Sequence, residues 1–130
     1  MISWFKERRR KKRYQVLWDA ELEAVFSDYD YKGGMDVTVV DFSGLGAVIH
    51  AKDIYMDRRH LAAPYNPPEL NLKIHSPEGI LEYQIDIKRY DLLIEDKVFE
   101  IGVEFLNISS KNQELVDLLI KNLRLQKKGR

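Results

Sequence analysis

Apolar and polar residues alternate along several stretches in the middle of the chain. Between residues 16 and 26 one face is apolar, whereas the opposite face carries Asp19, Glu21 and Glu23. A two-residue period of this kind is typical of a β-strand with one buried side. The same alternation, or a short apolar run, occurs in residues 37–41, 47–50, 70–75, 81–88 and 99–105. About six one-sided strands predict an antiparallel sandwich or a small barrel.

Turn-forming residues separate these strands. Lys32-Gly33-Gly34, Asn66-Pro67-Pro68 and Pro77-Glu78-Gly79 combine Gly, Pro and Asn in ways that favour turns. We therefore expect the two glycines at 33 and 34 to form a hairpin turn and not a phosphate-binding loop. The segment Lys52–Ala63 fits either a loop or a short helix between strands, and residues 52–68 as a whole are interpreted as a surface loop.

The C-terminal part of the chain changes to a helical period. Ser110-Lys111-Asn112-Gln113 has the form of a capping box, in which Ser110 is the N-cap and Gln113 reaches back to it. Five positions then recur at helical spacing and would form one stripe: Leu115, Leu118, Leu119, Asn122 and Leu123. Cations follow near the end, where they suit the helix macrodipole. These features predict a helix of about 12–16 residues that packs one stripe onto the strands.

Length and composition narrow the class of protein. The chain has 130 residues, which fits one domain with its own core, and it contains no cysteine. The lack of cysteine excludes a disulfide framework, a Cys-ligated zinc site and thiol catalysis. No apolar stretch approaches the roughly 18–20 residues that cross a bilayer, and the N-terminus lacks the apolar segment of a secretory signal. We therefore expect a cytoplasmic protein without a membrane span.

The net charge of zero conceals a strong segregation of charge. Residues 1–13 carry seven Lys/Arg and one Glu, a net of +6, and residues 121–130 carry five Lys/Arg and no acid. Residues 14–120 have a net charge of −11. A general nucleic-acid-binding protein would spread basic charge over one face, so we expect no DNA or RNA partner. The pattern divides the chain into a basic arm, residues 1–13, and a folded part, residues 14–130.

Two motifs stand out from this background. The basic run contains R-x-x-x-R through Arg9 and Arg13, and residues 41–46 read D-x-S-x-x-G at the end of an apolar strand. Each motif alone is weak, because any basic run contains such a spacing and Asp, Ser and Gly are common in turns. Together and in this order, they resemble the signature of the PilZ family. Residues 101–105, which read I-G-V-E-F, are similar to the last barrel strand of that family.

The resemblance covers the chain from about Lys6 to Arg124 and implies both a fold and a function. The implied fold is mainly β, a six-stranded antiparallel β-barrel with a C-terminal α-helix. The implied function is that of a receptor for the bacterial second messenger cyclic di-GMP, with no enzymatic activity and no cofactor besides this ligand. The family acts in motility, exopolysaccharide synthesis and virulence, and the sequence does not determine the pathway, the downstream partner or the oligomeric state.

The resemblance assigns ligand binding to Arg9, Arg13, Asp41, Ser43 and Gly46. An arginine guanidinium can fork onto guanine O6 and N7 or onto phosphate oxygens, and it can stack on a purine. A carboxylate such as that of Asp41 accepts from the N1–H and N2–H₂ donors of guanine. Ser43 can add a hydroxyl contact, and Gly46 would let the backbone turn or approach the base closely.

Arg8 and Arg10 are further candidates. In the family the residue before R-x-x-x-R, here Arg8, lies close to the ligand, and a cation there would favour a stacked ligand pair over a single molecule. A solvated arginine is the alternative. Because the seven cations of residues 1–13 repel one another, we expect the ligand to gather this arm against residues 41–46. Ordering of the arm would then be the output signal.

No enzyme site can be assembled from the sequence. His50, His60 and His75 lack H-E-x-x-H spacing, and the chain has no Walker loop, G-x-S-x-G motif or dinucleotide fingerprint. Two other functions stay open. One is a PilZ-like interaction module that has lost its ligand, and the other is a membrane-surface or nucleic-acid adaptor that uses Trp4, Phe5 and the basic run.

Overall fold

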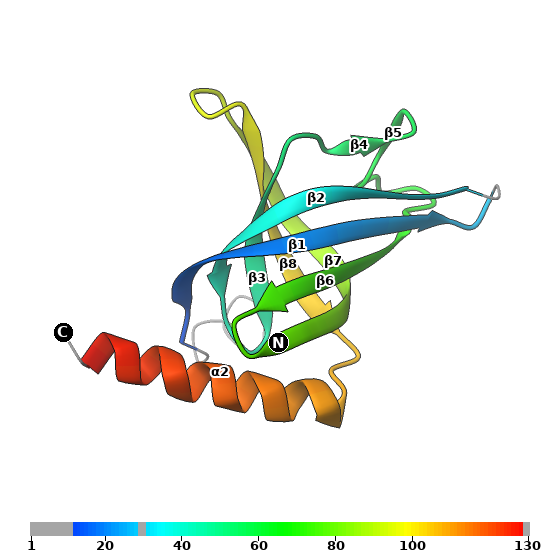
Figure 1. The fold of residues 1–130 in the computed structure, drawn as a ribbon. Coiled ribbons are helices and arrows are strands. Elements are labelled where there is room, and N and C mark those ends of the chain that lie inside the picture. Colours follow the sequence, from blue (N-terminus) through cyan, green and yellow to red (C-terminus); the bar gives the residue numbers. More distant parts are fainter. Residues whose placement is uncertain (1–11, 29–30, 129–130) are drawn as a thin grey trace, which may run out of the picture.

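The computed structural model describes residues 12–28 and 31–128 of the chain. Over these ranges the chain forms eight β-strands and one α-helix (Figure 1). In chain order these are β1 (Tyr14–Phe26), β2 (Tyr31–Phe42), β3 (Gly46–Ala51), β4 (Tyr55–Met56), β5 (Arg59–His60), β6 (Glu69–Ser76), β7 (Gly79–Leu93), β8 (Val98–Leu106) and α2 (Ser110–Lys128).

Six of these strands close into a barrel. Their order is β1-β2-β3-β8-β7-β6, every pair is antiparallel, and β6 returns to pair with β1. Closure removes the exposed strand edges that would otherwise pair with other chains. The prediction of a mainly β fold, with a six-stranded antiparallel barrel and a C-terminal helix, is therefore confirmed.

Alternation along the strands directs one face into the barrel. In β1, every second residue from Trp18 to Phe26 is buried. Phe42 of β2 packs between Trp18 and Phe105, with ring centroids 5.1 and 5.9 Å apart, and Tyr83 stacks flat on Phe105 at 3.8 Å. Each large apolar side chain buried in this way contributes roughly 1.5–3 kcal/mol. The barrel is thus stabilised from its interior.

The two glycines at positions 33 and 34 lie inside β2, so the predicted hairpin turn at this point is wrong. Gly33 pairs with Ala24 and Gly34 with Glu23, and the connection lies instead between Phe26 and Tyr31. A Cβ on Gly33 would lie 2.6 Å from the Tyr31 hydroxyl and 2.9 Å from the Met56 sulfur. Glycine suits this position because the side chains of Tyr31 and Met56 pass over the strand. The sequence pattern does not distinguish such a glycine from one in a turn.

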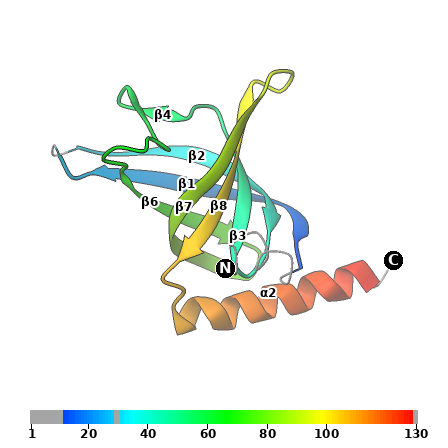
Figure 2. The ribbon, with the colours of Figure 1, turned by 180° about the vertical axis from the view of Figure 1, so that it is seen from behind.

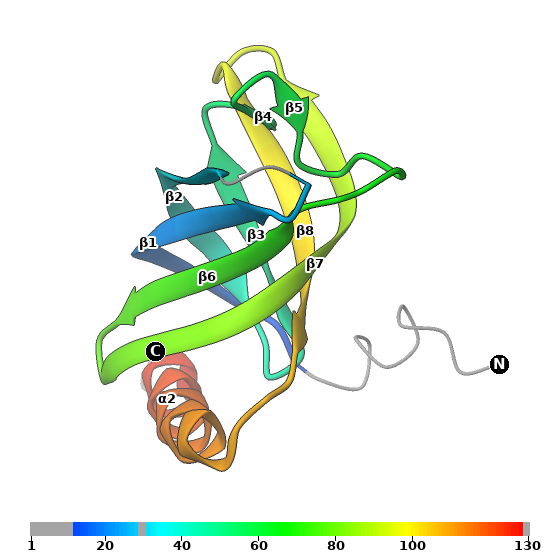
Figure 3. The same ribbon diagram turned by 90° about the vertical axis from the view of Figure 1, so that its right-hand side faces the viewer.

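The segment from Lys52 to Ala63 is neither a plain loop nor a helix. It contains the small hairpin β4–β5, which lies at the end of the barrel away from α2 (Figure 3). Three of its side chains, Ile54, Met56 and Leu61, are buried in the barrel core. The interpretation of residues 52–68 as a surface loop is therefore wrong, because part of this segment closes one end of the core.

Helix α2 lies across the opposite end of the barrel (Figure 2). It has 19 residues, longer than predicted. Its buried face contains Val116 and Leu119, which are 1% and 2% exposed, and Ile120 is half-buried. Leu118, which we expected in the packed stripe, is 45% exposed. The predicted helical period was therefore right, but the buried face of the helix is rotated by about one residue relative to the predicted stripe.

The N-cap of α2 is Ser109 and not Ser110 as predicted. The Ser109 hydroxyl accepts from the backbone N–H of Asn112 at 3.1 Å, and the Ser109 carbonyl accepts from Gln113 N–H at 2.9 Å. The Gln113 side chain does not reach back; its amide donates to Asp117 at 2.8 Å. Two consecutive serines offer the same hydroxyl, and the approach of the chain from β8 decides which one caps the helix.

Candidate ligand-binding site

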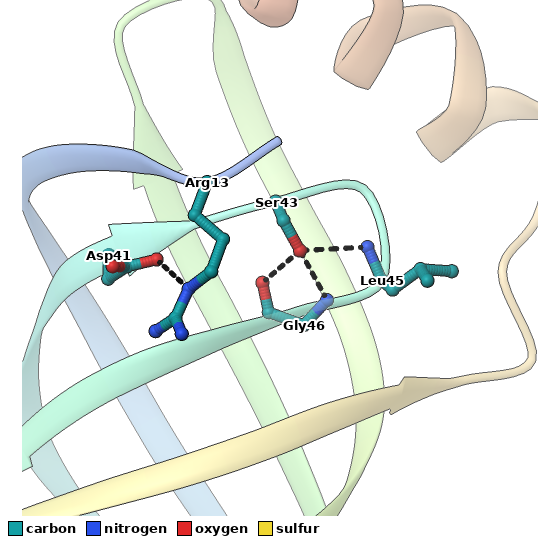
Figure 4. A network of polar contacts seen from close by, with 5 residues as sticks. All are labelled: Arg13, Asp41, Ser43, Leu45 and Gly46. Atoms are coloured by element: carbon teal, nitrogen blue, oxygen red, sulfur yellow. Dashed lines mark hydrogen bonds and ion pairs between the residues drawn. The ribbon is translucent and has the colours of Figure 1, made fainter. Parts of the chain in front are cut away.

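The predicted site begins with an ion pair between residues 28 positions apart in the sequence. Arg13 lies directly before β1, and Asp41 lies near the end of β2, where it pairs with Gln15 of β1. The Arg13 Nε donates to Asp41 Oδ1 at 2.9 Å. Figure 4 shows both terminal nitrogens of Arg13 directed away from this carboxylate. The antiparallel pairing of β1 with β2 therefore brings one arginine of the R-x-x-x-R motif to the aspartate of D-x-S-x-x-G.

Solvent reaches both partners of this pair. The side chains of Arg13 and Asp41 are 40% and 23% exposed. A pair this exposed contributes little to stability, at most about 1 kcal/mol. Its charged groups stay available to an outside ligand, and the guanidinium offers N–H donors beyond the one that Asp41 accepts.

Ser43 holds the β2–β3 turn together from within. The residue is fully buried, and its hydroxyl accepts from the N–H groups of Leu45 and Gly46, both at 3.2 Å (Figure 4). The same hydroxyl donates to the Gly46 carbonyl at 3.3 Å, and Ser43 N–H donates to that carbonyl at 2.9 Å. Ser43 therefore shapes the loop beside Asp41, and a direct contact of its hydroxyl with a ligand stays a prediction.

Gly46 allows β3 to approach β8 at its first residue. A Cβ at this position would lie only 2.3 Å from the carbonyl oxygen of Val103. The adjacent Leu45 carbonyl accepts from Phe105 N–H at 2.9 Å, which ties the turn to β8. Glycine is required here for contact with a neighbouring strand, and this requirement is independent of any ligand.

Arg8, Arg9 and Arg10 lie outside the described residues. The structure thus brings together four of the seven predicted site residues, namely Arg13, Asp41, Ser43 and Gly46. The division of the chain into an arm, residues 1–13, and a folded part, residues 14–130, stays a prediction.

A groove of about 660 Å³ lies beside this turn, between it and α2. Lys12, Tyr14, Lys121 and Arg124 contribute to its lining, together with the acidic Asp117. Arg124 Nε donates to the Tyr14 hydroxyl at 3.2 Å, and Lys12 Nζ lies 5.9 Å from the centroid of the same ring. Cations from the two ends of the chain therefore gather at one groove next to the Arg13–Asp41 pair.

This convergence was not evident from the sequence. The C-terminal cations suit the helix macrodipole whatever lies beside them, and 110 positions separate Arg124 from Tyr14. The opposite charges of body and ends were the available signal. Charge counts alone do not show that the two ends meet.

Lys88, on the outer face of β7, is a weaker candidate than Arg13. A hydrogen bond to Asp86 at 2.9 Å, with Glu104 3.8 Å away, raises the pKa of Lys88. Its charge is thus already engaged by two carboxylates. Lysine also lacks the planar fork that matches guanine or phosphate.

The three histidines each have a local partner. His50 contacts Glu100 at 3.1 Å, His75 contacts Glu21 at 2.8 Å, and His60 accepts from Ala62 N–H at 3.0 Å. Within residues 12–28 and 31–128, no group of three or more His, Asp or Glu side chains is arranged to hold a metal ion. No helix in these ranges is both long and apolar enough to cross a bilayer.

Comparison with known proteins rests on structure. No protein-family model and no curated protein sequence matches the chain. The PilZ domain of YcgR from Escherichia coli, solved with c-di-GMP, has a TM-score of 0.55 at 14% identity, over 94% of this chain and 95% of that domain.

Two longer proteins match as well. The inhibitor of motility MotI/DgrA of Bacillus subtilis has a TM-score of 0.65 at 17% identity, over 95% of this chain and 53% of that one. MrkH of K. pneumonia in its apo state has a TM-score of 0.67 at 13% identity, over 90% of this chain and 51% of that one. The chain spans about half the length of these two proteins. The barrel, its strand order and the closing helix together have the fold of a PilZ domain.

Proposed function

We propose that this chain is a receptor domain for cyclic di-GMP. The observation that carries the proposal is the ion pair between Arg13 and Asp41. It joins the two halves of a signature that the sequence separates by 28 positions, and it lies on the outer surface of the barrel. YcgR and MrkH, which share the fold, have been solved with c-di-GMP, and this supports the proposal.

The chemistry of the pair suits this ligand. Cyclic di-GMP has two guanines and two phosphates, so a site for it needs both acceptors for guanine N–H groups and donors for phosphate oxygens. The Asp41 carboxylate accepts from N1–H and N2–H₂ of one guanine. The terminal nitrogens of Arg13, which face away from Asp41, fork onto a phosphate or a purine edge.

The buried residues of the motif act on the site indirectly. Ser43 and Gly46 hold the turn that positions Asp41, one by its hydrogen bonds and the other by its close approach to Val103. The remaining arginines, Arg8, Arg9 and Arg10, complete the site from the arm. Arg9 pairs with the second guanine or phosphate, and Arg8 favours a stacked ligand pair.

Ordering of the arm is the proposed output. Ligand phosphates reduce the mutual repulsion among the seven cations of residues 1–13 and draw these cations to the barrel surface around Asp41. Hydrogen exchange of residues 1–13 with and without ligand tests this step. Unchanged protection in the liganded state would contradict it, while leaving ligand binding itself intact.

Isothermal titration calorimetry with cyclic di-GMP tests the receptor function. We expect micromolar or tighter binding, which corresponds to about −8 kcal/mol or better, and little or no binding of GTP or cyclic di-AMP. Arg13→Ala removes charge-assisted hydrogen bonds and is expected to cost about 2–3 kcal/mol of binding free energy. Lys73→Ala, which removes one charge from the exposed surface of β6, is the matched control and is expected to bind like the wild type.

Other outcomes point to other functions. Absence of binding heat at low salt would refute the receptor proposal and favour a protein-interaction module of the same fold. Binding of equal strength to cyclic di-AMP, GTP and anionic vesicles, with a steep loss at higher salt, would instead indicate an electrostatic adaptor.

A further inference from the structure

A row of outward-facing residues extends from Asp41 around the barrel. Asp41 of β2 pairs with Val48 of β3, Val48 pairs with Gly102 of β8, and Gly102 pairs with Arg89 of β7. Adjacent strands are about 4.8 Å apart, so Asp41 and Gly102 are separated by roughly 10 Å. Buried core residues next to Asp41, Val48 and Gly102 direct these three positions outward: Phe42, Ala47, Ile49, Ile101 and Val103.

The middle of this row is flat and apolar. Val48 is only 3% exposed although it belongs to the outer face, and Gly102 has no side chain. A Cβ on Gly102 would lie 3.0 Å from Cγ and 3.2 Å from Nε of Arg89, so the stem of Arg89 lies directly over Gly102. The result is an apolar strip, Val48 and Gly102, which the Arg89 stem covers at Gly102, with the Asp41 carboxylate on one side and the Arg89 guanidinium on the other.

Within the described residues, the guanidinium of Arg89 is held by long ion pairs alone. Its NH1 lies 3.6 Å from Glu100 and 3.7 Å from Asp91, compared with 2.9 Å in the Arg13–Asp41 pair. The side chain is 43% exposed. The strand also has a register shift between Ile87 and Arg89, and irregularities of this kind redirect a side chain. An arginine held in this way can exchange its carboxylate contacts for a ligand at little cost.

We infer that Arg89 is a further ligand-binding residue, which contacts the guanine that Asp41 holds. This inference rests on the proposed function. The Arg89 stem moves off Gly102, and the purine takes its place on Val48 and Gly102 with the N1–H and N2–H₂ groups toward Asp41. Its O6 and N7 acceptors then point toward β7, where the Arg89 guanidinium forks onto both of them. A purine with a donor at position 6, as in adenine, presents the wrong group to Arg89, and the site therefore selects guanine through two adjacent edges of the base.

Calorimetry with two ligands tests this assignment. The ligands are cyclic di-GMP and its 7-deazaguanine analogue, which lacks the N7 acceptor. The proteins are the wild type, Arg89→Ala, Arg89→Lys and the control Lys73→Ala on β6, a barrel strand that the row does not cross. We expect Arg89→Ala to weaken cyclic di-GMP binding at least about tenfold. Arg89→Lys should weaken it nearly as much because lysine lacks the fork, and Lys73→Ala should stay within about twofold.

The analogue separates a ligand contact from a structural effect. If Arg89 binds N7, the loss of affinity caused by 7-deaza substitution is large in the wild type and smaller in both Arg89 variants. Equal losses in all proteins would overturn the assignment, and so would unchanged binding in Arg89→Ala. Should Arg89→Ala fail to fold, Arg89→Lys keeps the charge and decides the question alone. If the wild type does not bind cyclic di-GMP, the proposed function itself fails, and the role of Arg89 fails with it.

Discussion

A methyl group added at position 46 would test how the turn beside Asp41 is built. In Gly46→Ala the new Cβ would lie 2.3 Å from the carbonyl oxygen of Val103. An unstrained contact needs about 3.5 Å, so β3 and β8 must separate locally by roughly 1 Å. The obstacle is backbone and not the end of a flexible side chain, which leaves no small adjustment that relieves it.

The expected loss of stability follows from this displacement. Overpacking of a tight site costs about 1–3 kcal/mol. The separation also weakens the hydrogen bond from Phe105 N–H to the Leu45 carbonyl and those that Ser43 makes with Gly46, each worth about 1 kcal/mol. We therefore expect Gly46→Ala to lower the free energy of unfolding by about 3–5 kcal/mol, a large part of the 5–15 kcal/mol typical of a domain.

Urea unfolding followed by fluorescence measures this loss, because Trp18 is buried against Phe42 and reports on the core. With an m-value of about 1–3 kcal/mol/M, the midpoint should fall by about 2 M. Gly34→Ala is the control, since its Cβ would lie 3.4 Å from the nearest atom, the Leu22 carbonyl oxygen. It should change the free energy of unfolding by no more than about 0.5–1 kcal/mol. Equal midpoints for the two variants would refute the reasoning.

Three further predictions concern single side chains. The buried Tyr83 hydroxyl has no hydrogen-bond partner within the described part of the chain, and burial raises its pKa. Tyr83→Phe should therefore raise the free energy of unfolding by about 1 kcal/mol, and a lower melting temperature would contradict this. A double-mutant cycle on Arg13 and Asp41 should give a coupling of at most about 1 kcal/mol in the free energy of unfolding. Each single variant should nevertheless bind cyclic di-GMP at least about tenfold more weakly. A large coupling in stability would mean that the pair is mainly structural. A hydrogen bond from His75 holds the pKa of Glu21 below its ordinary value of 4.5. The stability that this carboxylate contributes is therefore present above pH 4.5 and is lost as the pH falls through the lowered pKa. NMR titration should show this pKa rising toward 4.5 in His75→Ala, and no change would refute the assigned cause.

Local patterns in the sequence were sufficient for most of the strands. The period of two in residues 16–26, 81–88 and 99–105 marks parts of β1, β7 and β8, because side chains on an extended backbone alternate whatever the strand pairs with. The turn at residues 77–79 was also evident, since Pro and Gly restrict or extend the backbone locally. The resemblance to the PilZ signature, which depends on the order of the two motifs, assigned Arg13 and Asp41 to the same site.

Other features depend on contacts that a linear pattern does not contain. Gly33 reads as a turn but is a strand residue beneath Tyr31 and Met56. The C-terminal helix could present either of two overlapping apolar stripes, and packing on the barrel selected the one with Val116. In each case the residue type was informative, but its role depends on an atom far away in the sequence.

The sequence by itself determined the class of fold, the approximate strands, the closing helix and the two motifs of the proposed site. The tertiary structure decided which of those residues face the surface. It buried Ser43, placed Gly46 against Val103 and aligned Arg89 with Asp41 across four strands. The physical reason is that periodicity is a property of a short piece of backbone, whereas strand register and close approach are set by pairing between distant segments.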